Sequence, residues 1–196
     1  MLSCMAAELN DNALMLRYRD GDMAAFETLY ERHKGPLFRF LLRHTDNQQF
    51  AEDVFQEVWA KIIKSRNNYR SAAKFTTYMY RIARNSTIDH YRRSGRQPAL
   101  LQEHNEHATE LAAPGDDPVT AAEHRDLQRS LMTALNSLPE EQREVFLLRE
   151  ESGFTLAEIS EITATGTETV KSRLRYALVK IRQCMPPADI KGVDHD

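Results

Sequence analysis

The chain has 196 residues, a formal net charge of −3 and 41% hydrophobic residues, with only seven glycines and seven prolines. This profile suits a helix-rich globular protein and argues against collagen-like, disordered and all-β classes. The sequence has no run of about 18 apolar residues and no basic start followed by an apolar stretch, so we expect neither a membrane span nor a secretory signal, and its two distant cysteines favour the reducing cytoplasm.

Basic residues are concentrated in one segment. Between Lys61 and Arg96 there are ten basic residues and one acidic residue, whereas residues 99–117 hold five acidic residues and no lysine or arginine. A basic block in a mildly acidic protein indicates a nucleic-acid-binding face, although a solvated helix surface would give the same charge count.

The first half of the chain is predicted to be helical, with short breaks. Asp22 is placed to cap a helix over Met23–Leu42, which Gly35-Pro36 is expected to break or kink. Apolar residues at helical spacing predict further helices over Ala51–Ile63 and Lys74–Arg93.

The helical periodicity divides the chain into two domains. We assign residues 1–98 to a first domain and residues 118–187 to a second, which begins with a helix to Leu138. The acidic residues 99–117 are predicted to be a flexible linker, and residues 188–196 an acidic tail. The expected fold class is all-α: two small helical domains joined by a flexible acidic linker.

The second domain carries the strongest local signal, a helix-turn-helix pattern over Gly153–Gln183. Two T-x-x-E patterns, beginning at Thr155 and Thr165, predict capping boxes that open its two helices, and residues 163–166 predict the turn. An ordinary antiparallel helix pair is the alternative interpretation.

The outward face of the second of these helices has the residue types that suit a DNA major groove. Arginine and lysine neutralise phosphates or donate to guanine, and serine and threonine add short hydrogen bonds. Glu168 could accept from a cytosine amino group or only complete the capping box. The candidate DNA-binding residues are Thr167, Glu168, Thr169, Lys171, Ser172, Arg173 and Arg175.

Five segments in this order resemble one protein family. They are GDMAAFETLYERHKGPLFRFL, AEDVFQEVWAKI, FTTYMYRIARNSTIDHYRR, LPEEQREVFLLREESGFTLAEIS and ETVKSRLRYALVKIR. Together they resemble bacterial RNA polymerase sigma factors of the extracytoplasmic-function type, the small two-domain group of the sigma-70 family. The resemblance implies a non-enzymatic subunit that binds core RNA polymerase and gives it promoter specificity.

The resemblance implies a polymerase-binding face on the helix that follows Ala51. The corresponding residues are Asp53, Gln56 and Glu57, whose spacing of three and four places them on one helix face. The alternative is plain surface solvation with an ion pair from Glu57 to Lys61.

The resemblance also implies that the first domain recognises the −10 promoter element as single-stranded DNA. Basic residues interleaved with aromatic ones fit this role, because stacking on an aromatic ring is worth about 1–3 kcal/mol per base. Phe75, Tyr78 and Ile82 are expected in the core instead. The candidate residues, from the loop Asn67–Lys74 and the following helix, are Tyr69, Arg70, Asn85, Asp89, Arg92 and Arg93.

By the same resemblance, the second domain binds the −35 element as duplex DNA, and an anti-sigma factor is expected to clamp both domains. The expected partners are thus core RNA polymerase, promoter DNA and an anti-sigma factor. The acidic linker could occupy the RNA-exit path of the polymerase or serve only as a tether.

We expect no cofactor and no metal. His104 and His107 form an HxxH pattern without a cysteine partner, and Cys184 is either a redox sensor or an inert thiol. No nucleophile elbow, P-loop or HExxH motif is present, which argues against an enzyme. A two-component regulator would also end in a helix-turn-helix, but residues 1–93 lack the strands of its receiver domain.

Overall fold

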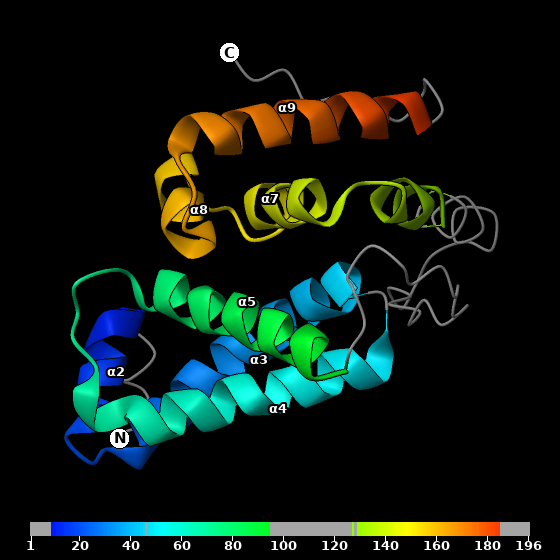
Figure 1. Ribbon diagram of the computed structural model, residues 1–196. Helices are drawn as coiled ribbons and strands as arrows, with labels where there is room; N and C mark the ends of the chain where they lie inside the picture. Colours follow the sequence, from blue (N-terminus) through cyan, green and yellow to red (C-terminus); the bar gives the residue numbers. More distant parts are fainter. Residues whose placement is uncertain (1–8, 46, 95–126, 128, 185–196) are drawn as a thin grey trace, which may run out of the picture.

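The computed structural model describes residues 9–45, 47–94, 127 and 129–184, and every regular element in these ranges is helical (Figure 1). The prediction of an all-α fold is confirmed. The predicted linker 99–117 and tail 188–196 lie outside the described residues, and so do His104 and His107. The first unit contains α2 (Asp11–Arg19), α3 (Met23–Thr45), α4 (Gln48–Ser65), the short 3-10 helix η1 (Arg66–Asn68) and α5 (Phe75–Ser94). The second contains a helix over residues 127 and 129–136, then α7 (Glu140–Glu150), α8 (Leu156–Thr163) and α9 (Thr167–Cys184).

Helix α3 corrects one prediction, because it runs without a break from Met23 to Thr45 with Pro36 inside it. A proline removes one backbone hydrogen bond of the helix, but buried residues on both sides of it hold the helix in place. Leu29 lies before the proline and Leu37 after it, and both are fully buried. The predicted cap at the start of this helix is confirmed, since Asp22 Oδ1 accepts from the backbone N–H of Ala25 at 3.3 Å.

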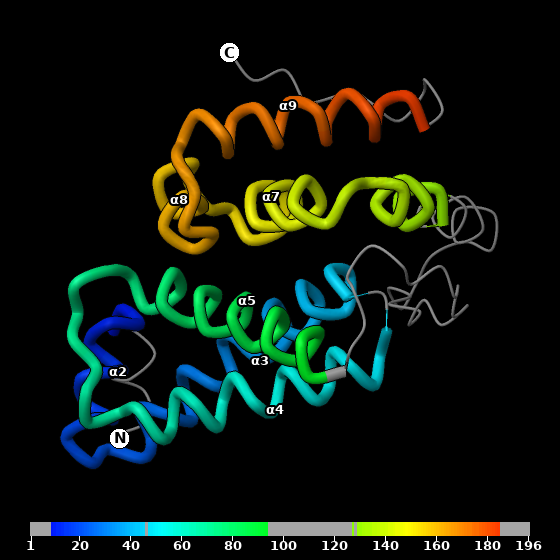
Figure 2. Tube along the Cα trace, in the orientation of Figure 1, coloured from blue at the N-terminus to red at the C-terminus, as the bar shows by residue number. Residues whose placement is uncertain are grey.

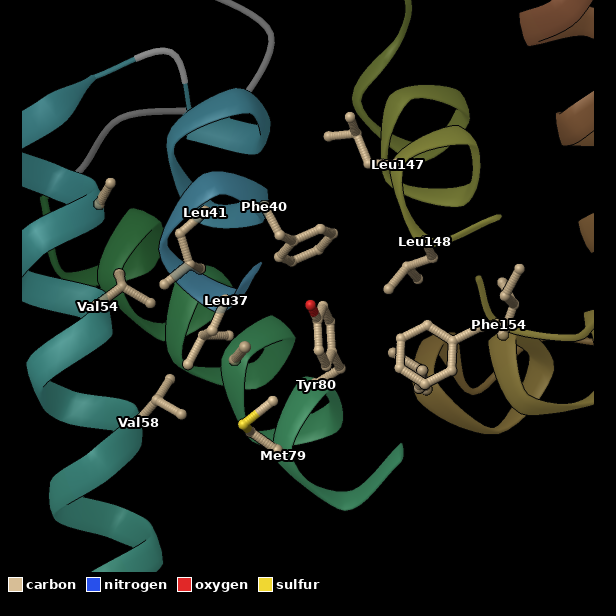
Figure 3. Close-up of a cluster of buried hydrophobic side chains, with 14 of the residues drawn as sticks. Leu37, Phe40, Leu41, Val54, Val58, Met79, Tyr80, Leu147, Leu148 and Phe154 are labelled. Carbon is tan, nitrogen blue, oxygen red and sulfur yellow. The ribbon is translucent and has the colours of Figure 1, made fainter. Parts of the chain in front are cut away.

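The core of the first unit lies where α3, α4 and α5 meet. Helix α4 begins behind Asn47, whose side chain accepts from the Phe50 N–H at 2.8 Å. One stripe of α4 is then buried, including Val54 and Val58, which face Leu41 and Leu37 of α3 (Figure 3). The opposite face of α4 is left exposed.

The second unit is built from shorter helices that pack around α9. Helix α7 follows Pro139, which stands at its N-cap. Helix α8 opens with the predicted capping box, in which Thr155 and Glu158 exchange hydrogen bonds. Buried residues of α8 and α9, such as Ile159 and Val170, complete this core.

The two units lie against each other, with α8 beside α5 and α7 beside α3 (Figures 1 and 2). Tyr80 of α5 is the centre of the contact and is 3% exposed. Its ring meets Phe40 at 5.0 Å and Phe154 of the second unit at 4.9 Å, both edge-on (Figure 3). The Ser152 hydroxyl donates to the Tyr80 hydroxyl at 3.2 Å.

Ion pairs surround this aromatic contact, and in each of them the base belongs to the first unit and the acid to the second. Arg84 pairs with Glu144 at 3.1 Å in a nearly buried position, since the Glu144 side chain is 7% exposed. Burial raises the pKa of Glu144, although the charge of Arg84 acts in the opposite direction. The other pairs are Arg43–Glu151, Lys74–Glu158 and Arg81–Glu161.

Candidate nucleic-acid interface

The polar face of α4 is presented to solvent, as predicted for a docking surface. Asp53 and Gln56 are exposed, whereas Glu57 is partly covered. The neighbouring apolar residues Val54 and Val58 are fully buried in the core. The burial pattern of one amphipathic helix therefore orients this acidic face outward.

Glu57 is not a free carboxylate. It pairs with Lys61 at 2.8 Å on its own helix and with Arg93 of α5 at 2.7 Å. Partial burial acts to raise the pKa of Glu57, but the hydrogen bonds from Lys61 and Arg93 outweigh it and leave the pKa lowered. An ion pair thus joins Glu57, a predicted polymerase-binding residue, to Arg93, a predicted DNA-binding residue. The pair borders an open hollow that Asp53 and His90 also line.

The loop between η1 and α5 contains two of the predicted DNA-binding residues, and they differ in exposure. Arg70 is exposed. Tyr69 is 4% exposed, and its ring packs edge-on against Tyr78 at 5.4 Å. Burial raises the pKa of Tyr69 to about 12, so its hydroxyl remains a hydrogen-bond donor at neutral pH. In this conformation Tyr69 supports the loop, and its contact with a base stays a prediction.

The four candidates on α5 share an exposed surface of that helix. Asn85, Asp89, Arg92 and Arg93 are all exposed, and their spacing of three and four residues matches the helical period. Lys61 of α4 extends toward the same surface, since its ammonium donates to the Ser86 hydroxyl at 2.9 Å. Phe75 is buried, as predicted for a core residue.

The turn between α8 and α9 has the geometry of a helix-turn-helix connection. Ala164 takes a left-handed conformation with φ of 52° and ends α8. The predicted second capping box is wrong: α9 begins only at Thr167, Thr165 bonds to Thr163 at 2.8 Å, and Glu168 pairs with Lys171 at 2.7 Å. The turn is one residue longer than the T-x-x-E pattern assumes, so Thr165 lies too far from the helix to cap it.

Helix α9 buries Val170, Ala177 and Ile181 and presents its other side to solvent. Arg173 is the exception among the predicted contacts, because it pairs with Glu141 of α7 and its side chain is 20% exposed. The exposed candidates are Thr167, Glu168, Thr169, Lys171, Ser172 and Arg175.

Tyr176 is a candidate contact that the sequence analysis left out. It is 55% exposed, and the Arg175 guanidinium lies 5.1 Å from its ring centroid. The sequence signal for this contact is an aromatic residue directly after an arginine on the charged side of a predicted helix.

Within the described residues, no cluster of histidine, cysteine or acidic side chains could hold a metal ion. Cys184 is a free, exposed thiol at the end of α9. None of the helices described here has the length and apolarity that a membrane span requires.

Two family models match the chain, one in each unit. The model described as Sigma-70 region 2 matches residues 29–97, and the model described as Sigma-70, region 4 matches residues 128–181. The first range holds α4, α5 and the loop between them, and the second holds the helix-turn-helix.

Curated relatives match over nearly their whole length. The chain is 29% identical to the ECF RNA polymerase sigma-E factor of Haemophilus influenzae over 192 residues, which covers 93% of this chain and 99% of the relative. It is also 29% identical to the RNA polymerase sigma factor CarQ of Myxococcus xanthus, covering 90% of this chain and 98% of CarQ.

Solved structures show the same fold. CnrH, in complex with the cytosolic domain of CnrY, superposes with a TM-score of 0.65 at 20% identity, covering 88% of this chain and 95% of CnrH. The sigma factor RpoE of Bartonella quintana, in complex with the anti-sigma factor NepR, superposes with a TM-score of 0.66 at 22% identity, covering 81% and 95%. The paired region models and the full-length relatives place the chain in the sigma-70 family, among the RNA polymerase sigma factors of the extracytoplasmic-function group.

Proposed function

We propose that this chain binds core RNA polymerase and directs it to promoters, with the first unit acting at the −10 element and the second at the −35 element. The observation that carries the proposal is the pairing of two exposed surfaces on one chain: the acidic face of α4 and the outward face of the helix-turn-helix. A regulator that binds DNA alone needs only the second of these.

The polymerase contact is assigned to the exposed residues of α4. Asp53 and Gln56 are available for an intermolecular contact, whereas Glu57 would have to leave Lys61 and Arg93 or bring them into the contact. Asp53 and Gln56 are therefore the primary docking residues, and Glu57 is a secondary one.

The DNA contacts are divided between the two units. The single-stranded −10 element is assigned to exposed residues of α5 and of the loop before it, together with the buried Tyr69 of that loop. The exposed residues are Arg70, Asn85, Asp89, Arg92 and Arg93. The duplex −35 element is assigned to the first two turns of α9, because the recognition helix of this motif contacts bases with its N-terminal residues. Arg173 reaches phosphate only when it leaves Glu141.

Reading both elements at once requires the two units to separate. The elements lie about 25 base pairs apart, which is about 85 Å at 3.4 Å per pair. In the structure, α8 contacts α5 directly, and α9, which packs on α8, has 18 residues and is therefore about 27 Å long. Units packed in this way cannot place α5 and α9 on DNA sites that are about 85 Å apart. The arrangement described here is therefore the closed form of a chain that opens on the promoter.

The experiment is transcription with purified core polymerase and the full chain on genomic DNA fragments. The proposal expects starts at defined promoters only when both proteins are present. Footprints on duplex DNA without core polymerase, and no initiation with it, would identify an independent repressor instead.

An anti-sigma factor is the proposed regulator, and the cytoplasm is the proposed place of action. CnrH was solved with the cytosolic domain of CnrY and RpoE with the anti-sigma factor NepR, which supports protein-level control for a chain of the same fold. Capture from the native host, under stressed and unstressed growth, tests this; constant absence of an antagonist would count against it.

A further inference from the structure

One amide in α2 makes four hydrogen bonds to the loop that precedes α5. Asn12 Oδ1 accepts from the Phe75 backbone N–H at 2.6 Å and from the Tyr69 hydroxyl at 3.2 Å. Asn12 Nδ2 donates to the Ser71 hydroxyl at 2.9 Å and to the Ala73 carbonyl at 3.1 Å. The amide therefore contacts both ends and the middle of the loop.

These bonds fix the orientation of the amide and use its full capacity. The Phe75 N–H can only donate and the Ala73 carbonyl can only accept, so the amide oxygen must face Phe75 and its nitrogen must face Ala73. A side-chain amide offers two donor hydrogens and two acceptor lone pairs, and all four are engaged. No charged side chain of similar size can satisfy the same set.

Asn12 also supplies the N-terminal cap that α5 lacks in its own sequence. The first N–H groups of a helix have no partner within the helix, and the residue before Phe75 is a lysine, which has no side-chain acceptor. Asn12 accepts the Phe75 N–H from 63 positions earlier in the chain. The start of α5 is thus held by another helix.

Helix α2 is itself anchored, so this cap is a fixed point. Asp11 pairs with Arg32 at 2.8 Å and with His33 at 2.8 Å, both on α3. These ion pairs fix α2 against α3, and they therefore fix the position of the neighbouring Asn12 relative to the loop before α5.

We propose that Asn12 is a positioning residue for −10 recognition, which holds residues 69–75 in the shape that receives unpaired bases. The inference rests on the proposed function, because it assigns a role within the −10 contact. Asn12 lies outside the residues matched by the region 2 model, 29–97. The loop it holds carries an exposed cation at each end, Arg70 and Lys74. Lys74 pairs with Glu158 of the second unit in the closed form, so it can face a DNA backbone only after the units separate. The shape of the loop then sets the spacing of the two cations.

The test compares holoenzymes assembled from core polymerase and the full chain, with either the natural residue or Asn12→Ala. The probes come from a promoter that the unaltered holoenzyme transcribes: a forked fragment with an unpaired −10 strand, and a duplex fragment with only the −35 element. We expect Asn12→Ala to weaken binding of the forked fragment by about tenfold or more and to change −35 binding and core affinity less than twofold. Hydrogen exchange of residues 69–75 in the free chain should accelerate.

Asn10→Ala is the matched control. Asn10 caps the same helix by accepting from the Ala13 N–H at 2.9 Å, so its loss weakens α2 by about 1 kcal/mol without a change in the loop. Unchanged forked binding in Asn12→Ala, an equal loss in Asn10→Ala, or an equal loss on the −35 fragment would each overturn the inference.

A second variant covers the case in which Asn12→Ala does not fold. Asn12→Asp keeps both acceptor bonds and places a carboxylate against the Ala73 carbonyl, so it should weaken forked binding while α5 keeps its cap. If it binds the forked fragment as well as the natural chain does, the inference fails. If the unaltered holoenzyme initiates nowhere, the proposed function fails, and the exchange measurement alone decides whether Asn12 holds the loop.

Discussion

The buried ion pair between Arg84 and Glu144 gives the sharpest test of the contact between the two units. Arg84→Met keeps the bulk of the side chain and removes its charge, which leaves Glu144 as a buried carboxylate without its partner. Removing one partner of a buried pair costs about 3–5 kcal/mol. Because Arg84 is 23% exposed, we expect the lower end, which is a shift of roughly a hundredfold from closed to open.

The effect of this substitution should depend on pH. Burial raises the pKa of Glu144 in the closed form, and losing the positive charge of Arg84 raises it further. A group with a raised pKa stabilises the closed form at low pH, and that contribution is lost as the pH rises through the raised value. Opening of Arg84→Met should therefore be large at pH 8 and smaller at pH 5.5.

Energy transfer between two dyes measures the opening. One dye is placed on the exposed Cys184 of α9 and the other on a cysteine at the exposed position Ala60 of α4, with Cys4→Ser to prevent a third label. Arg81→Met is the matched control, because its pair with Glu161 spans 4.0 Å with both side chains about half exposed, and such pairs contribute little. Equal energy transfer in the two variants at pH 8 would refute the reasoning.

Three further predictions concern the surfaces and the core. Asp53→Lys with Gln56→Lys should abolish core binding in a pull-down and leave the circular dichroism spectrum unchanged; retained binding would remove this face from the polymerase contact. Lys171→Ala should lower the salt slope of −35 binding by about 0.9, and an unchanged slope would mean that this lysine touches no phosphate. His44 is buried against Phe40 and near Arg143, and burial lowers its pKa to about 3. Because His44 is protonated only in the unfolded chain over this range, the free energy of unfolding should fall by about 2 kcal/mol between pH 7 and pH 5. Urea unfolding measures this loss, and an equal loss in His44→Leu would show that His44 does not cause it.

Much of the fold could be predicted from local patterns. The cap at Asp22 and the capping box at Thr155 form as expected, because each depends on residues three positions apart. Of the break or kink predicted at Gly35-Pro36, the break does not occur, since burial on both sides of Pro36 outweighs one lost hydrogen bond. The second capping box failed because the helix start shifted by one residue.

The features that the sequence could not predict depend on distant residues. Glu57 binds Arg93 across 36 positions, and Asn12 reaches the loop before α5 across about 60. Neither spacing leaves a periodic signal. The contact between Tyr80 and Phe154 was hidden for the same reason, and it brings together two units whose patterns suggested only a linker between them.

The contact between the two units should lower the affinity of the chain for DNA that carries both promoter elements. When only a fraction of the molecules is in the form that binds, the apparent dissociation constant rises by the inverse of that fraction. The outward face of α9 is already exposed in the closed form, so a fragment with the −35 element alone should bind the natural chain and Arg84→Met with equal affinity. Only the open form can span a fragment that has both elements. If closed chains persist in the holoenzyme, the holoenzyme with Arg84→Met should therefore bind this fragment more tightly than the holoenzyme with the natural chain. Equal affinities for both fragments would show that core polymerase opens the chain completely, and a gain on the −35 fragment alone would show that the closed contact masks α9.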